Sequence, residues 1–213
     1  MYRYIPNLIT VSRLLLTVLF FIAINVQTSA EEFSVMMWLA FAIFVLAVFS
    51  DALDGWLARH WKVETAFGRI VDPFADKILI CGAFVFFSFR EIVPNGVQLP
   101  AYMAGNAATG IVPWMAVVLI AREFLITGIR GYAESRGIDF RAQWAGKIKM
   151  IAQCLAVGAV LLCLALGPVF KASPILYDLF LARDAAIWVT VVVTVLSAVQ
   201  YVIRARQLIH DSV

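Results

Sequence analysis

The sequence predicts an all-α integral membrane protein with six transmembrane helices and a short N-terminal juxtamembrane segment. Of its 213 residues, 63% are hydrophobic and only 15% are charged, and the mean hydropathy is +0.90. These values lie far outside the range of soluble domains. A helix needs about 20 mostly apolar residues to cross a bilayer, and we place such stretches near residues 10–27, 34–58, 70–89, 109–132, 147–167 and 184–204.

The flanking residues justify these boundaries in order. Residues 1–7 mix aromatic and basic side chains, as a segment lying among lipid headgroups would. The second and fourth stretches end in charged segments, whereas the third ends before Arg90 and Pro94. Gly167 and Pro168 close the fifth stretch, and Arg183 with Asp184 opens the sixth. The longest polar connection is too short for a soluble domain, so residues 1–213 are expected to form a single membrane domain.

The basic residues predict the orientation. With six spans, both termini lie on one side of the membrane, together with the loops after the second and fourth spans. All but three of the 17 lysines and arginines fall on that side, the exceptions being Arg90, Lys171 and Arg183. The positive-inside rule therefore places both termini in the cytoplasm. Because no transit peptide rich in arginine and serine precedes the first span, a bacterial inner membrane is the expected location.

Four aspartates cluster at the predicted cytoplasmic side of the second and third spans: Asp51, Asp54, Asp72 and Asp76. Spacings of three and four residues put each pair on one face of its helix. The connection near residues 60–67 is short, so the helices are expected to be antiparallel neighbours that bring the pairs together. Carboxylates at membrane depth need a compensating charge, and hard oxygen donors suit magnesium or manganese. The cluster predicts a site for one or two such ions.

Small residues accompany the aspartates. Gly55 and Ala58 share the face of Asp51 and Asp54, where they either let helices pack closely or leave a slot for a flat ligand such as a nucleobase. Pro73 is expected to loosen the third helix or to mark its first turn. An acidic ion pathway in a transporter or channel is the alternative interpretation of intramembrane aspartates. The combined spacing of these positions argues against it.

The pattern Asp51-xx-Asp54-Gly55-xx-Ala58-Arg59-x8-Gly68-xxx-Asp72-xxx-Asp76 resembles the signature of the CDP-alcohol phosphotransferase family at every position. The resemblance implies a six-span enzyme that transfers a phosphatidyl or related group from a CDP-linked lipid to an alcohol and releases CMP. It implies that the four aspartates hold the metal ions and that Asp76 also takes the proton of the acceptor hydroxyl. Two cations would suit a diphosphate. The nucleotide and diphosphate positions are then Gly55, Ala58, Arg59 and Gly68.

Near the amino terminus, Asn7, Thr10 and Arg13 resemble the short polar motif that opens many of these enzymes. Their spacing of three residues forms one polar stripe on an apolar helix, which is expected to line the nucleotide or diphosphate pocket. Helix capping and membrane topology are the alternative explanation.

Basic residues of the fourth and fifth spans predict an anionic acceptor: Arg122, Arg130, Arg141, Lys147 and Lys149. Grouped at the side of the aspartates, they suit a phosphate, although basic residues there also satisfy the positive-inside rule and extend toward headgroups. The Arg122-Glu123-x6-Arg130 and Gly146-Lys147-Ile148-Lys149 patterns resemble those of phosphatidylglycerophosphate synthases, which use glycerol-3-phosphate. Met150 departs from the small polar residue expected there.

The prediction is therefore phosphatidyl transfer from CDP-diacylglycerol to glycerol-3-phosphate. Other acceptors stay open, namely phosphatidylglycerol in a cardiolipin synthase or inositol phosphate in a phosphatidylinositol phosphate synthase. Membrane prenyltransferases also bind diphosphates through aspartates, but they would need about nine spans and two separated acidic motifs. The expected partners are these substrates and membrane lipids, with no nucleic acid. Small residues such as Gly82, Ala83 and Gly158, and the family's common state, favour a homodimer.

Overall fold

Over the residues that the computed structural model describes, the chain forms six α-helices and no strand, which confirms the predicted fold class. The backbone is described for residues 5–26, 29–61, 66–89, 108–136, 144–170 and 174–211. Within these ranges, the description leaves out some side chains, namely those of residues 5–10, 30–31, 51–61, 66–73, 76, 134, 145, 168–170, 174, 176 and 207–211. The helices are α1 (Ile5–Asn25), α2 (Ala30–Trp61), α3 (Ala66–Phe89), α4 (Pro113–Ser135), α5 (Trp144–Phe170) and α6 (Pro174–Asp211).

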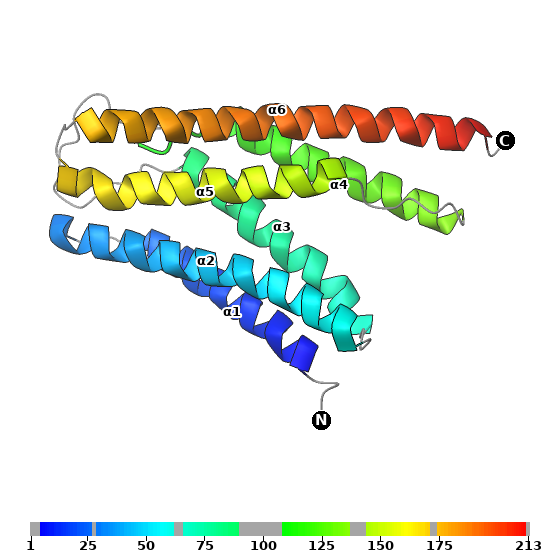
Figure 1. Cartoon of the computed structure of the whole chain (residues 1–213), viewed down its shortest axis with the longest axis horizontal. Helices are drawn as coiled ribbons and strands as arrows, with labels where there is room; N and C mark the ends of the chain where they lie inside the picture. Colours follow the sequence, from blue (N-terminus) through cyan, green and yellow to red (C-terminus); the bar gives the residue numbers. More distant parts are fainter. Residues whose placement is uncertain are drawn as a thin grey trace.

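The helices form a closed bundle, in an order that differs from their order in the sequence (Figure 1). Contacts join α1 to α2, α2 to α5, α5 to α6, α6 to α4, α4 to α3 and α3 back to α1. A further contact between α3 and α5 crosses the interior of this ring. Helices α3, α4, α5 and α6 therefore form a ring of their own, in which α3 contacts both α4 and α5.

Successive helices run in opposite directions, so that one end of the bundle collects several chain segments. Figure 1 shows both termini toward the same end as the last turns of α2 and α4 and the first turns of α3 and α5. This is the arrangement expected for an even number of antiparallel helices joined by short connections. The ends of α2 and α4, which carry the sequence patterns of interest, consequently lie on one side of the molecule.

Apolar side chains fill the interior of the bundle and also cover its outside. Fully buried core residues include Phe20, Met37, Phe84, Leu119 and Val157. Large apolar residues such as Leu15, Leu46, Phe124 and Leu181 are nevertheless more than half exposed. So much exposed apolar surface is unfavourable in water and is expected of helices that face lipid.

Segments of α2, α5 and α6 are long and apolar enough to cross a membrane: Glu32–Ser50, Gly146–Gly167 and Tyr177–Arg206. Shorter apolar segments, Val11–Asn25 and Lys77–Phe89, lie in the described parts of α1 and α3. The protein is therefore an integral membrane protein. In α4, Arg122, Glu123 and Arg130 interrupt the apolar sequence. That α1, α3 and α4 also cross the membrane stays a prediction.

Two helix boundaries differ from the expectations. Because α3 begins at Ala66, Pro73 lies inside this helix and not in its first turn. The sixth helix begins at Pro174, well before the predicted start of the span at residue 184. Arg183 and Asp184 therefore lie within α6 instead of opening it.

Local bonds explain how α6 carries this charged pair. Arg183 forms an ion pair with Asp184, with 2.7 Å between Nη2 and Oδ1, and its Nη1 donates to the backbone oxygen of Ala108 at 2.7 Å. Gly110 lies against the pair with a φ of 73°, and a Cβ there would come within 2.6 Å of Asp184 Oδ1. A glycine fits both the left-handed backbone and the close approach. A buried arginine that is paired in this way does not need to lie at a helix end.

The small residues from which a homodimer was predicted pack within the chain. A Cβ on Gly82 would meet the ring of Phe21 in α1, and one on Gly158 would contact Phe41 in α2. Ala83 is completely buried. These three positions therefore explain close packing between helices of one chain, and the homodimer stays a prediction.

Candidate functional site

The acidic signature lies where α2 ends and α3 begins. Asp51 and Asp54 are in the last turns of α2, and Asp72 and Asp76 are in the first half of α3. Figure 1 shows these two helix ends beside one another, and only residues 62–65 separate them in the sequence. The backbone thus brings the two aspartate pairs to one end of the bundle, as the spacing predicted.

The side chains of the four aspartates lie outside the described residues, as do those of Gly55, Ala58, Arg59 and Gly68. Among the side chains that are described, no group of three or more histidines, cysteines, aspartates or glutamates is arranged to hold a metal ion. The predicted metal site therefore rests on the backbone positions of the four aspartates and on the chemistry of their carboxylates.

Only one member of the predicted N-terminal stripe has a described side chain. Asn7 and Thr10 lie in the first turns of α1, and their side chains are outside the description. Arg13 is completely buried, in a helix that packs against both α2 and α3. A buried guanidinium must be compensated by polar or acidic groups, and the role of Arg13 in the nucleotide or diphosphate pocket stays a prediction.

A buried cluster of charges joins α4 to α5. The carboxylate oxygen Oε1 of Glu123 pairs with Lys149 Nζ and also with Arg122 Nη1, the latter at 3.3 Å. The side chains of Arg122, Glu123 and Lys149 are 8%, 12% and 10% exposed. Two cations thus share one carboxylate in the interior, leaving an excess of positive charge within this cluster. Such a cluster is suited to binding an anion.

The sixth helix holds Arg122 from the other side. Arg122 Nε donates to Ser197 Oγ at 3.1 Å, and its Cζ lies 5.6 Å from the centre of the Tyr201 ring. Neither α6 residue was predicted as part of the site. The sequence did contain a pattern that points to them. Polar residues recur at helical spacing in an otherwise apolar helix, and all four are buried in the structure: Thr190, Thr194, Ser197 and Tyr201.

A second unpredicted contact connects the cluster with the acidic helix α3. Lys77, the residue after Asp76, donates from Nζ to Thr127 Oγ1 of α4 at 2.6 Å. Thr127 Oγ1 in turn donates to the backbone oxygen of Glu123 at 2.7 Å. This chain of hydrogen bonds fixes α3 against α4 at the level of Asp76. The part of α3 that follows Asp76 in the sequence therefore lies beside the part of α4 that carries Glu123.

Two of the other basic residues predicted for the acceptor, Lys147 and Arg130, do not join this cluster. Lys147 is exposed and lies over the ring of Trp144, with Nζ 4.9 Å from the ring centre. Two positions separate it from Lys149, and residues at that spacing face different sides of a helix. Arg130 is half-buried two turns beyond Arg122, and Arg141 lies outside the described residues.

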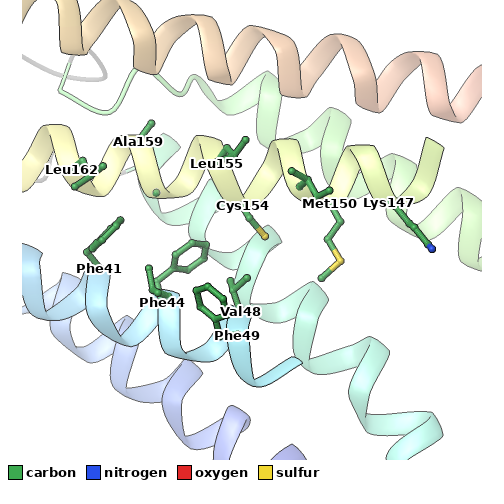
Figure 2. Close-up of a pocket in the computed structure, with 13 residues that line it drawn as sticks. Phe41, Phe44, Val48, Phe49, Lys147, Met150, Cys154, Leu155, Ala159 and Leu162 are labelled. Atoms are coloured by element: carbon green, nitrogen blue, oxygen red, sulfur yellow. The ribbon is translucent and has the colours of Figure 1, made fainter. Parts of the chain in front are cut away.

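An apolar groove of about 670 Å³ runs between α2 and α5. Figure 2 shows Phe44 and Val48 of α2 opposite Met150 and Cys154 of α5, with Lys147 at one end. Phe49 at the α2 side of the groove lies two residues before Asp51. The groove thus leads along the bundle from the acidic end of α2, and its size is within the range of about 300–1,000 Å³ common for ligand sites.

These features define a helical membrane protein that combines an acidic helix pair, a buried cationic cluster and an apolar groove, as a membrane enzyme with an anionic lipid substrate would. The profile of the family described as CDP-alcohol phosphatidyltransferase matches residues 3–196. The chain belongs to the CDP-alcohol phosphatidyltransferase family. It is accordingly a phosphatidyl-transferring enzyme of phospholipid biosynthesis, and the transporter and prenyltransferase alternatives are not supported.

Several named proteins are similar in sequence to this chain over most of their length. The chain is 30% identical over 204 residues to the CDP-diacylglycerol–glycerol-3-phosphate 3-phosphatidyltransferase of Bacillus subtilis, covering 92% of each protein. It is 33% identical to a probable phosphatidylglycerophosphate synthase of Mycobacterium tuberculosis, over 94% of this chain and 81% of the relative. A Haemophilus influenzae protein with the same name as the Bacillus enzyme is 31% identical over 74% of this chain and 75% of the relative.

Proposed function

We propose that this protein transfers the phosphatidyl group of CDP-diacylglycerol to glycerol-3-phosphate, which yields phosphatidylglycerophosphate and CMP. The observation that carries the choice of acceptor is the pairing of Arg122 and Lys149 with the single carboxylate of Glu123. An acceptor that brings its own phosphate would supply the negative charge that this buried cluster lacks. The relatives from Bacillus and Haemophilus are both named as glycerol-3-phosphate phosphatidyltransferases, which supports the same acceptor.

The aspartates form the proposed metal site. Four carboxylates, two from the end of α2 and two from the first half of α3, are a donor set that fits two magnesium or manganese ions. Asp51, Asp54, Asp72 and Asp76 would hold these ions. When bound, the ions would neutralise the diphosphate and stabilise the charge that develops on the leaving phosphate.

The chain's own residues would carry out the transfer in one displacement. Asp76 takes the proton of an acceptor hydroxyl as that oxygen attacks the phosphorus of the phosphatidyl group. The new oxygen–phosphorus bond forms while the bond to CMP breaks, and CMP leaves with the electron pair. Arg122 and Lys149 hold the acceptor's phosphate during this step. Lys77, bonded to Thr127, keeps α3 and α4 at a fixed separation.

The donor nucleotide would lie at the same end of the bundle. Gly55 and Ala58 leave space for the cytidine, and Arg59 and Gly68 complete the signature around the diphosphate. Asn7, Thr10 and Arg13 of α1 face the same pocket in this proposal, and the complete burial of Arg13 beside α2 and α3 supports it. The positive-inside rule would place this end in the cytoplasm of a bacterium with an inner membrane.

The test of the acceptor is a comparison of alcohols. The detergent-purified protein is incubated with CDP-diacylglycerol, magnesium or manganese and labelled glycerol-3-phosphate, phosphatidylglycerol, inositol phosphate or serine. We expect equal amounts of CMP and labelled lipid with glycerol-3-phosphate alone. CMP release with a different alcohol only would overturn the acceptor but keep the phosphatidyl transfer. No CMP with any of them would contradict phosphatidyl transfer itself.

The groove between α2 and α5 is proposed to hold an acyl chain of the donor lipid. Its lining is almost entirely apolar and includes the exposed Leu155, and its α2 side reaches Phe49, two residues before Asp51 in the sequence. A phosphatidyl group bound at the aspartates would direct its chains toward this groove. The exposed cation of Lys147 at the groove's end would meet phosphate or headgroup oxygens.

Filling the groove tests this assignment. We expect Ala159→Phe to raise the KM for CDP-diacylglycerol about tenfold, which corresponds to about 1.4 kcal/mol of lost binding, and to leave the KM for glycerol-3-phosphate unchanged. The matched control is Ala182→Phe, which adds the same ring to an exposed position of α6 away from the groove. Equal KM values for the two variants would show that the donor does not use the groove.

A further inference from the structure

The guanidinium of Arg122 is held in one orientation by three different groups. Nε donates to Ser197 at 3.1 Å, Nη1 pairs with Glu123 at 3.3 Å, and Cζ lies over the Tyr201 ring, 5.6 Å from the ring centre. Nη2 is the remaining nitrogen, and no described residue accepts its hydrogen bonds. A guanidinium fixed in this manner presents a single defined edge to a ligand.

The two α6 residues are themselves rigidly placed. The hydroxyl of Ser197 donates to the backbone oxygen of Thr194 at 2.9 Å, so that a lone pair of the oxygen is directed to Arg122. Ser197 and Tyr201 are 2% and 1% exposed. The Tyr201 ring belongs to a small buried cluster with Ile126 of α4. The sixth helix thus acts as the support against which the arginine of α4 is fixed.

We propose that Ser197 and Tyr201 are positioning residues for the acceptor, which orient Arg122 so that its free edge binds the phosphate of glycerol-3-phosphate. The inference rests on the proposed function and extends it to a helix outside the sequence signature. Neither residue touches the reacting atoms. Their contribution is to avoid the loss of side-chain freedom that an unsupported arginine would suffer when it binds the phosphate.

A positioning role and a general structural role predict different kinetics. If α6 orients Arg122, loss of the support raises the KM for glycerol-3-phosphate while the KM for CDP-diacylglycerol and the stability of the fold change little. If α6 only packs the bundle, the variants lose stability, and both substrates are affected alike. The two substrates therefore act as internal controls for each other.

Ser197→Ala removes the hydrogen-bond acceptor of Arg122 Nε. We expect the KM for glycerol-3-phosphate to rise about 10- to 150-fold, the range for a lost hydrogen bond to a charged group. The matched control is Ser88→Ala, because Ser88 is equally buried in α3 and its hydroxyl also donates to a backbone oxygen three residues earlier, at 2.8 Å. Its KM values are expected to equal those of the unmodified protein.

Tyr201 is tested with a conservative and a disruptive variant. Tyr201→Phe keeps the ring face over Arg122 and should retain a KM for glycerol-3-phosphate within about twofold, whereas Tyr201→Leu should raise it at least about fivefold. Tyr177→Leu, at an exposed position of the same helix, controls for the loss of a ring. Thermal unfolding in detergent, with and without glycerol-3-phosphate, adds a binding readout that is independent of turnover.

The outcomes separate this inference from the proposed function. If the unmodified protein does not release CMP with glycerol-3-phosphate, the proposed function fails, and the inference fails with it. If the unmodified protein is active but Ser197→Ala and Tyr201→Leu keep its KM for glycerol-3-phosphate, the inference alone is overturned. A selective rise of this KM, with a smaller stabilisation by glycerol-3-phosphate and normal controls, supports it.

Discussion

Replacing Asp76 with asparagine is expected to lower the rate of CMP release about 100- to 10,000-fold, the range over which a positioned general base contributes to catalysis. Asparagine has nearly the shape of aspartate but has no negative charge and takes no proton at neutral pH. The measurement is the initial rate of CMP release at saturating CDP-diacylglycerol and glycerol-3-phosphate. Asp178→Asn is the matched control, since Asp178 is an exposed aspartate near the start of α6, at the opposite end of the bundle from the acidic signature.

The same assay distinguishes the role of Asp76 from that of a residue that only holds metal. Asp51→Asn is expected to raise the magnesium or manganese concentration required for half-maximal activity, because it removes one oxygen ligand. For Asp76→Asn, the rate should stay low at every metal concentration. If high metal restored the rate of Asp76→Asn, the residue would be a ligand and not the base. Retention of more than a tenth of the activity of the unmodified protein without added metal would contradict the metal-holding role of these aspartates.

Much of the fold was predictable because bilayer thickness and hydropathy fix the length and composition of membrane helices. The six helices coincide with the six apolar stretches. The largest error was the start of α6, where Arg183 and Asp184 were interpreted as a helix boundary. Their charges are satisfied by each other and by the oxygen of Ala108, which is distant in sequence. Hydropathy contains no information about such partners.

The candidate site was predictable where its residues are close in sequence. The spacing of the aspartates placed them on adjacent helix ends, and the backbone agrees. The support of Arg122 by Ser197 depends on α6 lying beside α4, and a single sequence does not specify this order of helices. Helical periodicity alone would have separated Lys147 from Lys149. The groove arises from the separation of α2 and α5 and has no local sequence signal beyond apolar residues.

Glu123→Gln is expected to destabilise the protein by about 3–5 kcal/mol, the usual cost of removing one partner from a buried ion pair. Arg122 and Lys149 both use the same carboxylate oxygen, so the amide leaves two buried cations close together without a counter-charge. Thermal unfolding in detergent should show a midpoint lower by about 6–20 °C, given about 2–4 °C per kcal/mol for a chain of this size. The control, Glu32→Gln, changes an exposed glutamate of α2 and should leave the midpoint unchanged.

Thermal unfolding of Glu123→Gln in the presence of glycerol-3-phosphate tests whether the charge cluster binds the acceptor. In the unmodified protein the acceptor's phosphate must share Arg122 and Lys149 with Glu123, so that binding replaces part of an existing ion pair. In Glu123→Gln the phosphate would be the sole counter-charge, and it should therefore raise the unfolding midpoint more than it does in the unmodified protein. Glycerol, which has the hydroxyls but no phosphate, should raise neither midpoint at the same concentration. An unchanged midpoint for Glu123→Gln, or equal stabilisation by glycerol and glycerol-3-phosphate, would mean that the charge cluster is not where an anionic acceptor binds.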